Sequence, residues 1–226
     1  MSRPGPQLGE GPVNHDAFPN LILFDHPLIQ HKLTVARDRE TGPRLFRAVV
    51  AQVAALMVFE LTRSIPTEPA AVTTPTGDTA DGRTIEQRIT LVPVLRAGLG
   101  MTGSVLELIP QARVGHLGLS RDERTLQPTV YLQRLPRDLG AGPCILVDPM
   151  LATGGSAVRA VRILRDAGAT DLRMLCLIAA PEGVRALLEA DPNVTVYAAQ
   201  LDERLDERGF IRPGLGDAGD RLFGTV

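Results

Sequence analysis

Residues that could bind a phosphorylated sugar gather in one short stretch of the chain. Asp148 follows a run of apolar residues, and the hydroxyl residues Thr153 and Ser156 flank Gly154 and Gly155. Because glycine has no Cβ, the backbone N–H groups here can turn toward a bulky anion, and the hydroxyls add donors. A phosphate repels a carboxylate, so Asp148 is better suited to accept hydrogen bonds from sugar hydroxyls. The stretch predicts a ribose phosphate site, and an acid capping an ordinary strand-to-helix turn is the plainer alternative.

The sequence on either side of this stretch predicts the elements that hold it. Residues 144–147 are all apolar, which is typical of a strand buried on both faces of a parallel sheet. After Ala157, the apolar residues Val158, Val161 and Leu164 recur with helical spacing, and Gly168 is a plausible stop. A helix that begins here presents its positive end to the loop, which favours a phosphate. We therefore expect strand, loop and helix in that order.

A second glycine-rich turn follows another predicted buried strand, at residues 89–95. Arg96 comes directly after this strand, and residues 98–103 spell G-x-G-x-x-G, a pattern of dinucleotide-binding proteins when an acid follows at the right distance. Asp122 lies at about that distance, but in a polar segment rather than at the end of a strand. The inserted arginine also disfavours a dinucleotide. A glycine loop that carries an arginine suits pyrophosphate better, because guanidinium supplies charge and amides supply geometry.

Strand and helix patterns alternate along most of the chain. The predicted strands are residues 89–95, 112–119, 144–147, 172–180 and 194–201, and the predicted helices are residues 25–33, 42–64, 157–167 and a helix that starts at Pro181. Such alternation predicts an α/β fold with a parallel sheet and helices on both faces, whose ligands bind beyond the carboxyl ends of the strands.

Two segments do not fit this alternation. Residues 1–20 are rich in proline and glycine, and we expect them to form a disordered arm ahead of a single domain over residues 21–226. Residues 66–83 are rich in Thr, Pro, Gly and Asp, which indicates turns and part of a hairpin. No function is assigned to either segment.

The composition excludes several classes of protein. The net charge is -2 and the pI is about 6.1, so no global basic field indicates nucleic acid or membrane binding. The sequence lacks a signal-peptide pattern and an apolar stretch long enough to span a bilayer, so a cytoplasmic protein is expected. Cys144 and Cys176 lie in apolar runs, which favours core packing over a metal or redox role.

Four stretches together resemble the type I phosphoribosyltransferases, in the form carried by uracil phosphoribosyltransferases. Residues 148–156 resemble the family's phosphoribosyl pyrophosphate (PRPP) loop, and residues 92–101 its pyrophosphate loop. Residues 121–128 resemble its flexible arm, and residues 213–221 its uracil loop. The motifs occur in the family's order, and the resemblance runs from about Asp25 to the C-terminus.

The resemblance implies transfer of ribose 5-phosphate from PRPP to N1 of uracil, which gives UMP and pyrophosphate. It further implies a flexible β-arm, a small hood, Mg²⁺ bound mainly through PRPP, a possible GTP effector and a homo-oligomer, dimeric or higher. The catalytic residues that it indicates are Asp148, Arg96, Arg121 and Asp217. The residues expected to bind PRPP are Arg96, Arg121, Asp148, Pro149, Met150, Leu151, Ala152, Thr153, Gly154, Gly155, Ser156 and Asp217. The residues expected to bind uracil, largely through backbone groups, are Ile211, Gly216, Asp217 and Ala218.

Some positions depart from the family's pattern, and some alternatives stay open. Phe210 stands where the family often has Tyr, and Arg212 where an aliphatic residue is usual. Arg124 and Gln127 replace expected acids, so no role is carried over to them. Taken alone, the residues around Gly216 could be a glycine-rich surface turn. At the level of the whole chain, an RNA-binding regulator that keeps the fold, which the acidic pI disfavours, and a transferase for another base are the rival hypotheses.

Overall fold

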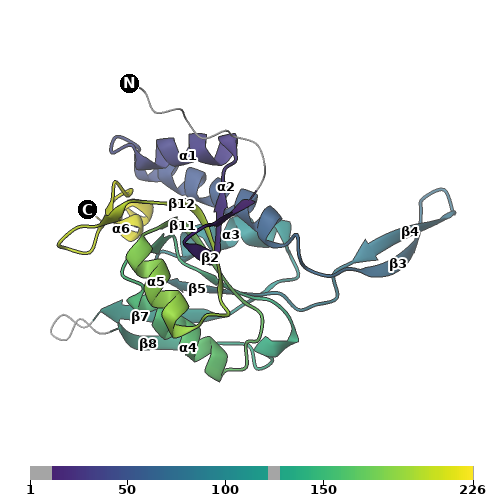
Figure 1. The fold of residues 1–226 in the computed structure, drawn as a ribbon. Coiled ribbons are helices and arrows are strands. Elements are labelled where there is room, and N and C mark those ends of the chain that lie inside the picture. Colours follow the sequence, from purple (N-terminus) through teal and green to yellow (C-terminus); the bar gives the residue numbers. More distant parts are fainter. Residues whose placement is uncertain (1–11, 122–127, 226) are drawn as a thin grey trace.

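The structure, a computed structural model, describes residues 12–121 and 128–225. Its centre is a 10-stranded sheet in which β2, β12, β11, β9, β5 and β7 are neighbours in that order and run parallel (Figure 1). The antiparallel strands β1 and β8 lie at its two edges. The strands are β1 (Pro12–His15), β2 (Phe18–Phe24), β3 (Glu68–Thr73), β4 (Thr79–Thr84), β5 (Thr90–Leu95), β6 (Arg113–Val114), β7 (His116–Arg121), β8 (Pro128–Arg134), β9 (Cys144–Val147), β10 (Met150–Leu151), β11 (Leu172–Ala179), β12 (Thr195–Leu201), β13 (Arg204–Leu205) and β14 (Ile211–Arg212).

Helices cover both faces of this sheet, as the alternating pattern predicts. The helices are α1 (Pro27–Arg37), α2 (Pro43–Leu61), α3 (Leu99–Leu108), α4 (Gly155–Asp166), α5 (Pro181–Ala190) and α6 (Ala218–Phe223). Along β9, Ile145 and Val147 belong to the core that includes α1, α2 and α3, whereas Cys144 and Leu146 belong to the core that includes α4 and α5. A strand buried on both faces needs apolar residues at every position, which explains the unbroken apolar run.

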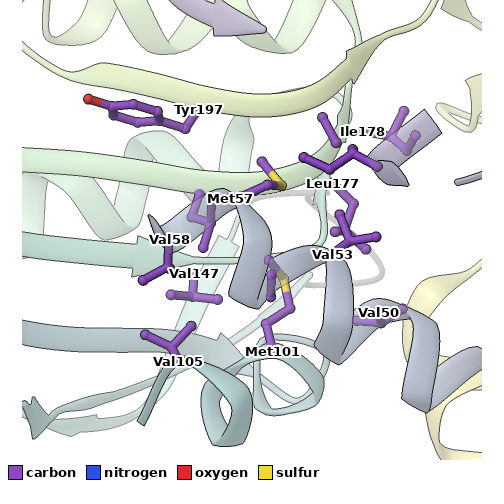
Figure 2. Packing of buried hydrophobic residues seen from close by; sticks show 14 of the residues in the cluster. Val50, Val53, Met57, Val58, Met101, Val105, Val147, Leu177, Ile178 and Tyr197 are labelled. Carbon is purple, nitrogen blue, oxygen red and sulfur yellow. The ribbon is translucent and has the colours of Figure 1, made fainter. Parts of the chain in front are cut away.

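Helix α2 contributes more buried residues to the first of these two cores than any other element. Figure 2 shows Val53 and Met57 of this helix beside Leu177 and Ile178 of β11, with Met101 of α3 beneath them.

On the other face, the thiol of Cys144 is buried, and this burial raises its pKa to about 12. Cys176 is likewise buried and free, so the prediction that both cysteines pack in the core is confirmed. None of the helices in the described part of the chain combines the length and apolar character needed to cross a membrane.

The hairpin expected within residues 66–83 is present and projects away from the sheet (Figure 1). Its strands β3 and β4 pair in register from Glu68 with Thr84 to Thr73 with Thr79, and most of their residues are exposed. The predicted strand at residues 112–119 is interrupted at Gly115, where a Cβ would lie 2.9 Å from the side chain of Leu135. This contact lies far away in the sequence, so the local pattern did not reveal it.

The predicted disordered arm over residues 1–20 is wrong for residues 12–20. Those residues form β1 and the start of β2, which continues to Phe24 and pairs with β12 through Leu21, Ile22 and Leu23. Pro19 is tolerated because it lies where the pairing with β1 shifts register, so no ladder hydrogen bond requires its missing N–H. Residues 1–11 lie outside the described part of the chain. The single domain over residues 21–226 stays a prediction.

Candidate functional site

The stretch that begins at Asp148 leaves the carboxyl end of β9 in the middle of the sheet. The amides of Leu177 and Ile178 in β11 both donate to the Pro149 carbonyl, at 3.0 and 3.2 Å. Gly154 then takes a φ of +82°, which glycine adopts without strain, and α4 begins at the next residue. The predicted order of strand, loop and helix is confirmed, and the loop is fixed to the sheet at its first turn.

The first turn of α5 holds the other side of this loop. A Cβ on Gly183 would lie 2.7 Å from the Leu151 carbonyl oxygen and closer still to that of Ala152. Conversely, a Cβ on Gly154 would lie 2.9 Å from the Gly183 carbonyl oxygen. Both contacts are backbone against backbone, so neither position has room for a side chain. Gly183 is not among the residues predicted from the sequence, because its only local signal is a glycine in the first turn of a helix.

Asp148 is half-buried at the start of the loop, and its carboxylate has little local support. Its Oδ1 accepts one hydrogen bond, from the Met150 amide at a long 3.4 Å. Burial raises the pKa of Asp148 to about 7, and the Met150 amide offsets only part of this rise. A carboxylate that is costly to ionise in the free protein gains from a ligand that brings hydroxyl donors or positive charge.

A cleft of about 460 Å³ opens beside Asp148, between the loop and the C-terminal segment. Its volume lies within the range of small-molecule sites. The lining residues are Ala97, Asp148, Met150, Ala152, Ser156, Arg208, Gly209, Phe210, Ile211, Gly216, Asp217, Ala218 and Gly219. A smaller hollow of about 100 Å³ adjoins it and is lined by residues 148 and 150–157. All four predicted uracil-binding residues therefore share one cleft with Asp148, Met150, Ala152 and Ser156 of the predicted PRPP-binding set, whereas Arg96 does not line it.

A larger hollow, of about 640 Å³, lies between α4 and α5 and is flanked by Arg159 and Arg162. It includes neither Asp148 nor any residue of the C-terminal segment 209–219. We place the site in the cleft of about 460 Å³, because Asp148, the anion loop and the C-terminal segment face one space there.

The C-terminal segment enters the cleft through a small hairpin, β13 and β14. Arg212 forms an ion pair with Asp206, within the hairpin, and its side chain is not among those that line the cleft. Hydrogen bonds from the Phe210 amide, and then from Arg212 and the Arg208 amide, hold the pKa of Asp206 below its usual range. At the end of the segment, Asp217 caps α6 by accepting the Asp220 amide at 3.0 Å. Arg212 thus stabilises the hairpin rather than facing the cleft.

The two predicted pyrophosphate arginines lie at the same edge of the sheet. Arg96 is exposed directly after β5, and its guanidinium lies 5.6 Å from the centre of the Phe223 ring. The peptide bond between Leu95 and Arg96 is cis. Leu95 pairs with Gly118, so β7 extends three residues beyond that level to Arg121. The side chain of Arg121, and residues 122–127 with Arg124 and Gln127, lie outside the described part of the chain.

The cleft also includes a cation that the sequence analysis did not single out. Arg208 is exposed and lines the cleft next to Gly209, and within residues 12–121 and 128–225 its guanidinium takes part in no ion pair. A lone arginine in a charged turn has no distinguishing sequence pattern. Its position next to the cleft adds positive charge there.

Comparison with known proteins agrees with this geometry. Residues 22–225 match the family described as uracil phosphoribosyltransferase. Proteins of that name from Halalkalibacterium halodurans and Enterococcus faecalis are 56% and 52% identical to this chain, over 91% and 90% of it and 98% and 97% of their own lengths. The AQ2163 protein from Aquifex aeolicus superimposes with a TM-score of 0.86 at 36% identity, covering 91% of this chain and 99% of that one.

A more distant structure shows the fold alone. A hypoxanthine phosphoribosyltransferase from Staphylococcus aureus matches with a TM-score of 0.50 at 11% identity, over 75% of this chain and 85% of its own. The dinucleotide alternative for residues 98–103 falls away, because the glycine turn belongs to a fold and a family of transferases. The chain belongs to the uracil phosphoribosyltransferase family.

Proposed function

We propose that this protein transfers ribose 5-phosphate from PRPP to N1 of uracil, giving UMP and pyrophosphate. The observation that carries the proposal is the single cleft in which the Asp148 loop faces Gly216, Asp217 and Ala218. A product that carries a phosphate, a sugar and a base needs a binding site for each of the three within one continuous cleft. Family membership supports the same reaction.

The loop and α4 bind the 5′-phosphate. Amides at Gly154, Gly155 and Ser156 and the hydroxyls of Thr153 and Ser156 supply donors, and the 12-residue helix α4 begins at this point with its positive end. Because the backbone here is fixed by β11 and by Gly183, the donors need no rearrangement when the phosphate binds.

Asp148 acts on the sugar. It accepts hydrogen bonds from the ribose hydroxyls in its ionised form, and the same negative charge stabilises the positive charge that grows on the ribose as pyrophosphate departs. Asp217, across the cleft, lies between base and ribose. Arg96, directly after β5, and Arg121, the last residue of β7, bind the pyrophosphate end, where their charge stabilises the leaving group.

The residues present fit a magnesium ion carried by the substrate. Two carboxylates, Asp148 and Asp217, line the cleft, and no group of three potential metal ligands occurs among residues 12–121 and 128–225. Mg²⁺ is commonly held by one or two carboxylates together with substrate oxygens and water. Bound in this way, it would neutralise charge on the pyrophosphate. GTP activation and a homo-oligomeric assembly stay predictions of the family resemblance.

Backbone groups select the base. Within the described residues, the amides of Gly216 and Ala218 donate no hydrogen bond to the protein, and both residues line the cleft. A fixed N–H pairs with O4 of uracil but opposes the amino group of cytosine. A fixed carbonyl accepts the N3–H that neutral cytosine lacks. Two mismatched polar contacts can give discrimination on the order of 10⁴-fold.

A base screen tests the proposal. Purified protein is incubated with PRPP, Mg²⁺ and one of uracil, cytosine, hypoxanthine or adenine, and nucleotide and pyrophosphate are measured together. Equal amounts of UMP and pyrophosphate with uracil alone are expected. A nucleotide of another base as the main product would overturn the base assignment, and salt-dependent RNA binding without any nucleotide product would favour the regulator instead.

A further inference from the structure

A half-buried ion pair, Arg37 with Asp202, contacts the base-binding segment without lining the cleft. Asp202 follows β12, and its side chain is only 3% exposed. Arg37, the last residue of α1, donates to both of its carboxylate oxygens, from Nη1 at 2.8 Å and from Nη2 at 2.6 Å. Such a bidentate pair fixes both side chains in one plane.

This pair binds the backbone of Gly214 at two points. The Gly214 amide donates to Asp202 Oδ2 at 2.8 Å, and the Gly214 carbonyl accepts from Arg37 Nη1 at 2.7 Å. Gly214 is buried with a φ of +62°, and a Cβ there would collide with the Ile211 carbonyl. The two backbone groups of one tight-turn residue are therefore held by one pair of charges.

Gly214 immediately precedes the groups assigned to the base. Only Leu215 separates it from Gly216, and the Leu215 carbonyl is itself held by Arg221 at 2.8 Å. Backbone donors discriminate between bases only if the backbone cannot shift to suit a different base. Side chains that fix Gly214 and Leu215 thus set the position of the neighbouring amides.

We propose that the Arg37–Asp202 pair is a positioning device for base selection, which rests on the proposed function of the cleft. Neither side chain lines the cleft, so the pair acts only through the backbone of residues 214–218. Its loss should change the handling of uracil and not that of PRPP, whose loop is fixed separately by β11 and α5.

The test compares Arg37→Gln with a matched variant, Arg165→Gln. Arg165 also forms a half-buried ion pair, with Asp191 at 2.6 Å, and also donates to backbone carbonyls, those of Ala169 and Thr170. Both variants lose a charged pair, so both should lower the melting temperature. Arg37→Gln is expected to raise the KM for uracil by about tenfold or more. It should also lower the ratio of uracil to cytosine turnover, whereas Arg165→Gln leaves both unchanged.

Arg37→Lys covers the case in which Arg37→Gln does not fold. Lysine keeps the charge beside Asp202 but lacks the planar fork that reaches Asp202 and Gly214 together, so a smaller rise in the uracil KM is expected. The KM for PRPP should stay within about twofold of wild type in every variant, a shift smaller than the loss of one typical hydrogen bond.

Hydrogen exchange at residues 214–218 separates failure of this inference from failure of the proposed function. Faster exchange at these residues in the Arg37 variants than in Arg165→Gln supports the positioning role. This holds even if the wild-type protein makes no UMP, and in that case only the proposed function is overturned. Equal exchange, with an unchanged uracil KM and an unchanged base ratio, would overturn the inference.

Discussion

At the scale of single residues, the proposed reaction depends most on Asp148. We predict that Asp148→Asn lowers kcat by about 10²-fold or more, the range seen when one electrostatic contact to a developing charge is removed. The amide also places a donor against sugar hydroxyls and removes the charge beside the developing cation. The fold should survive, since only the Met150 amide bonds this side chain in the described structure. Steady-state kinetics and thermal melting measure the two effects.

Asp171→Asn is the matched control. Asp171 is also an aspartate next to a strand of the sheet. It comes directly before β11 rather than after a strand, and it pairs with Arg173 at 2.8 Å, away from the cleft. Its substitution should leave kcat unchanged. Wild-type rates for Asp148→Asn would remove Asp148 from the reaction.

The raised pKa of Asp148 makes a separate prediction about stability. The folded pKa is about 7, whereas an unfolded aspartate titrates near about 3.9. Between these values the folded state binds more protons, so this group's contribution to the free energy of unfolding falls as pH rises from about 4 to 7. The side-chain amide that replaces the carboxyl group in Asp148→Asn does not titrate, so the variant lacks this contribution.

The melting temperature of Asp148→Asn minus that of wild type should therefore increase from pH 5 to pH 8. All other titrating groups are shared and cancel in this difference. Melting followed by circular dichroism at several pH values measures it. A difference that stays constant with pH would show that the Asp148 pKa is not raised.

At the scale of elements, the close approach of α5 to the PRPP loop can be tested with two glycines. Gly183→Ala and Gly103→Ala both place a better helix former within a helix. At Gly103 in α3 a Cβ meets nothing within 4 Å, so we predict a gain of about 1 kcal/mol in the free energy of unfolding and unchanged activity.

At Gly183 the added Cβ would press on the Leu151 and Ala152 carbonyls, so the loop must shift. We predict a raised KM for PRPP and a lower free energy of unfolding, against the helix propensity. Chemical denaturation and kinetics on the two variants side by side decide this. If both variants gain stability equally, the loop is not held by α5.

The C-terminal segment allows a test of backbone readout. Arg212→Val removes an ion pair with Asp206 outside the cleft, so the uracil-to-cytosine ratio should stay nearly unchanged. Gly216→Val should abolish uracil use, because Gly216 has a φ of +79° and lines the cleft. Competition assays with both bases measure the ratio. A switch of preferred base in Arg212→Val would mean that a side chain reads the base.

The sequence predicts elements well where local pattern and burial coincide. The apolar run before Asp148 and the spacing of Val158, Val161 and Leu164 are sufficient for β9, the loop and α4. The contact of Gly183 with that loop, and the Arg37–Asp202 pair across 165 positions, arise only when the sheet brings distant segments together. No local pattern marks such contacts, because each partner alone looks like an ordinary residue of its own segment.

At the scale of the whole molecule, the parallel sheet explains why the site residues converge. Asp148 follows β9 and Arg96 follows β5, and these two strands are neighbours in the sheet. Alternating strands and helices made this edge predictable. The prediction for residues 12–20 was wrong because a segment rich in proline and glycine shows no strand pattern. The strand β2 pairs with β12, and this pairing depends on tertiary structure.

A crystal structure of the protein with UMP tests the central claim most directly, because UMP carries the phosphate, the ribose and the base at once. The account predicts the 5′-phosphate against the amides of residues 154–156, the ribose beside Asp148, and the base against Gly216 and Ala218. A phosphate bound instead between Arg159 and Arg162, in the larger hollow of about 640 Å³, with the base away from residues 216–218, would contradict it.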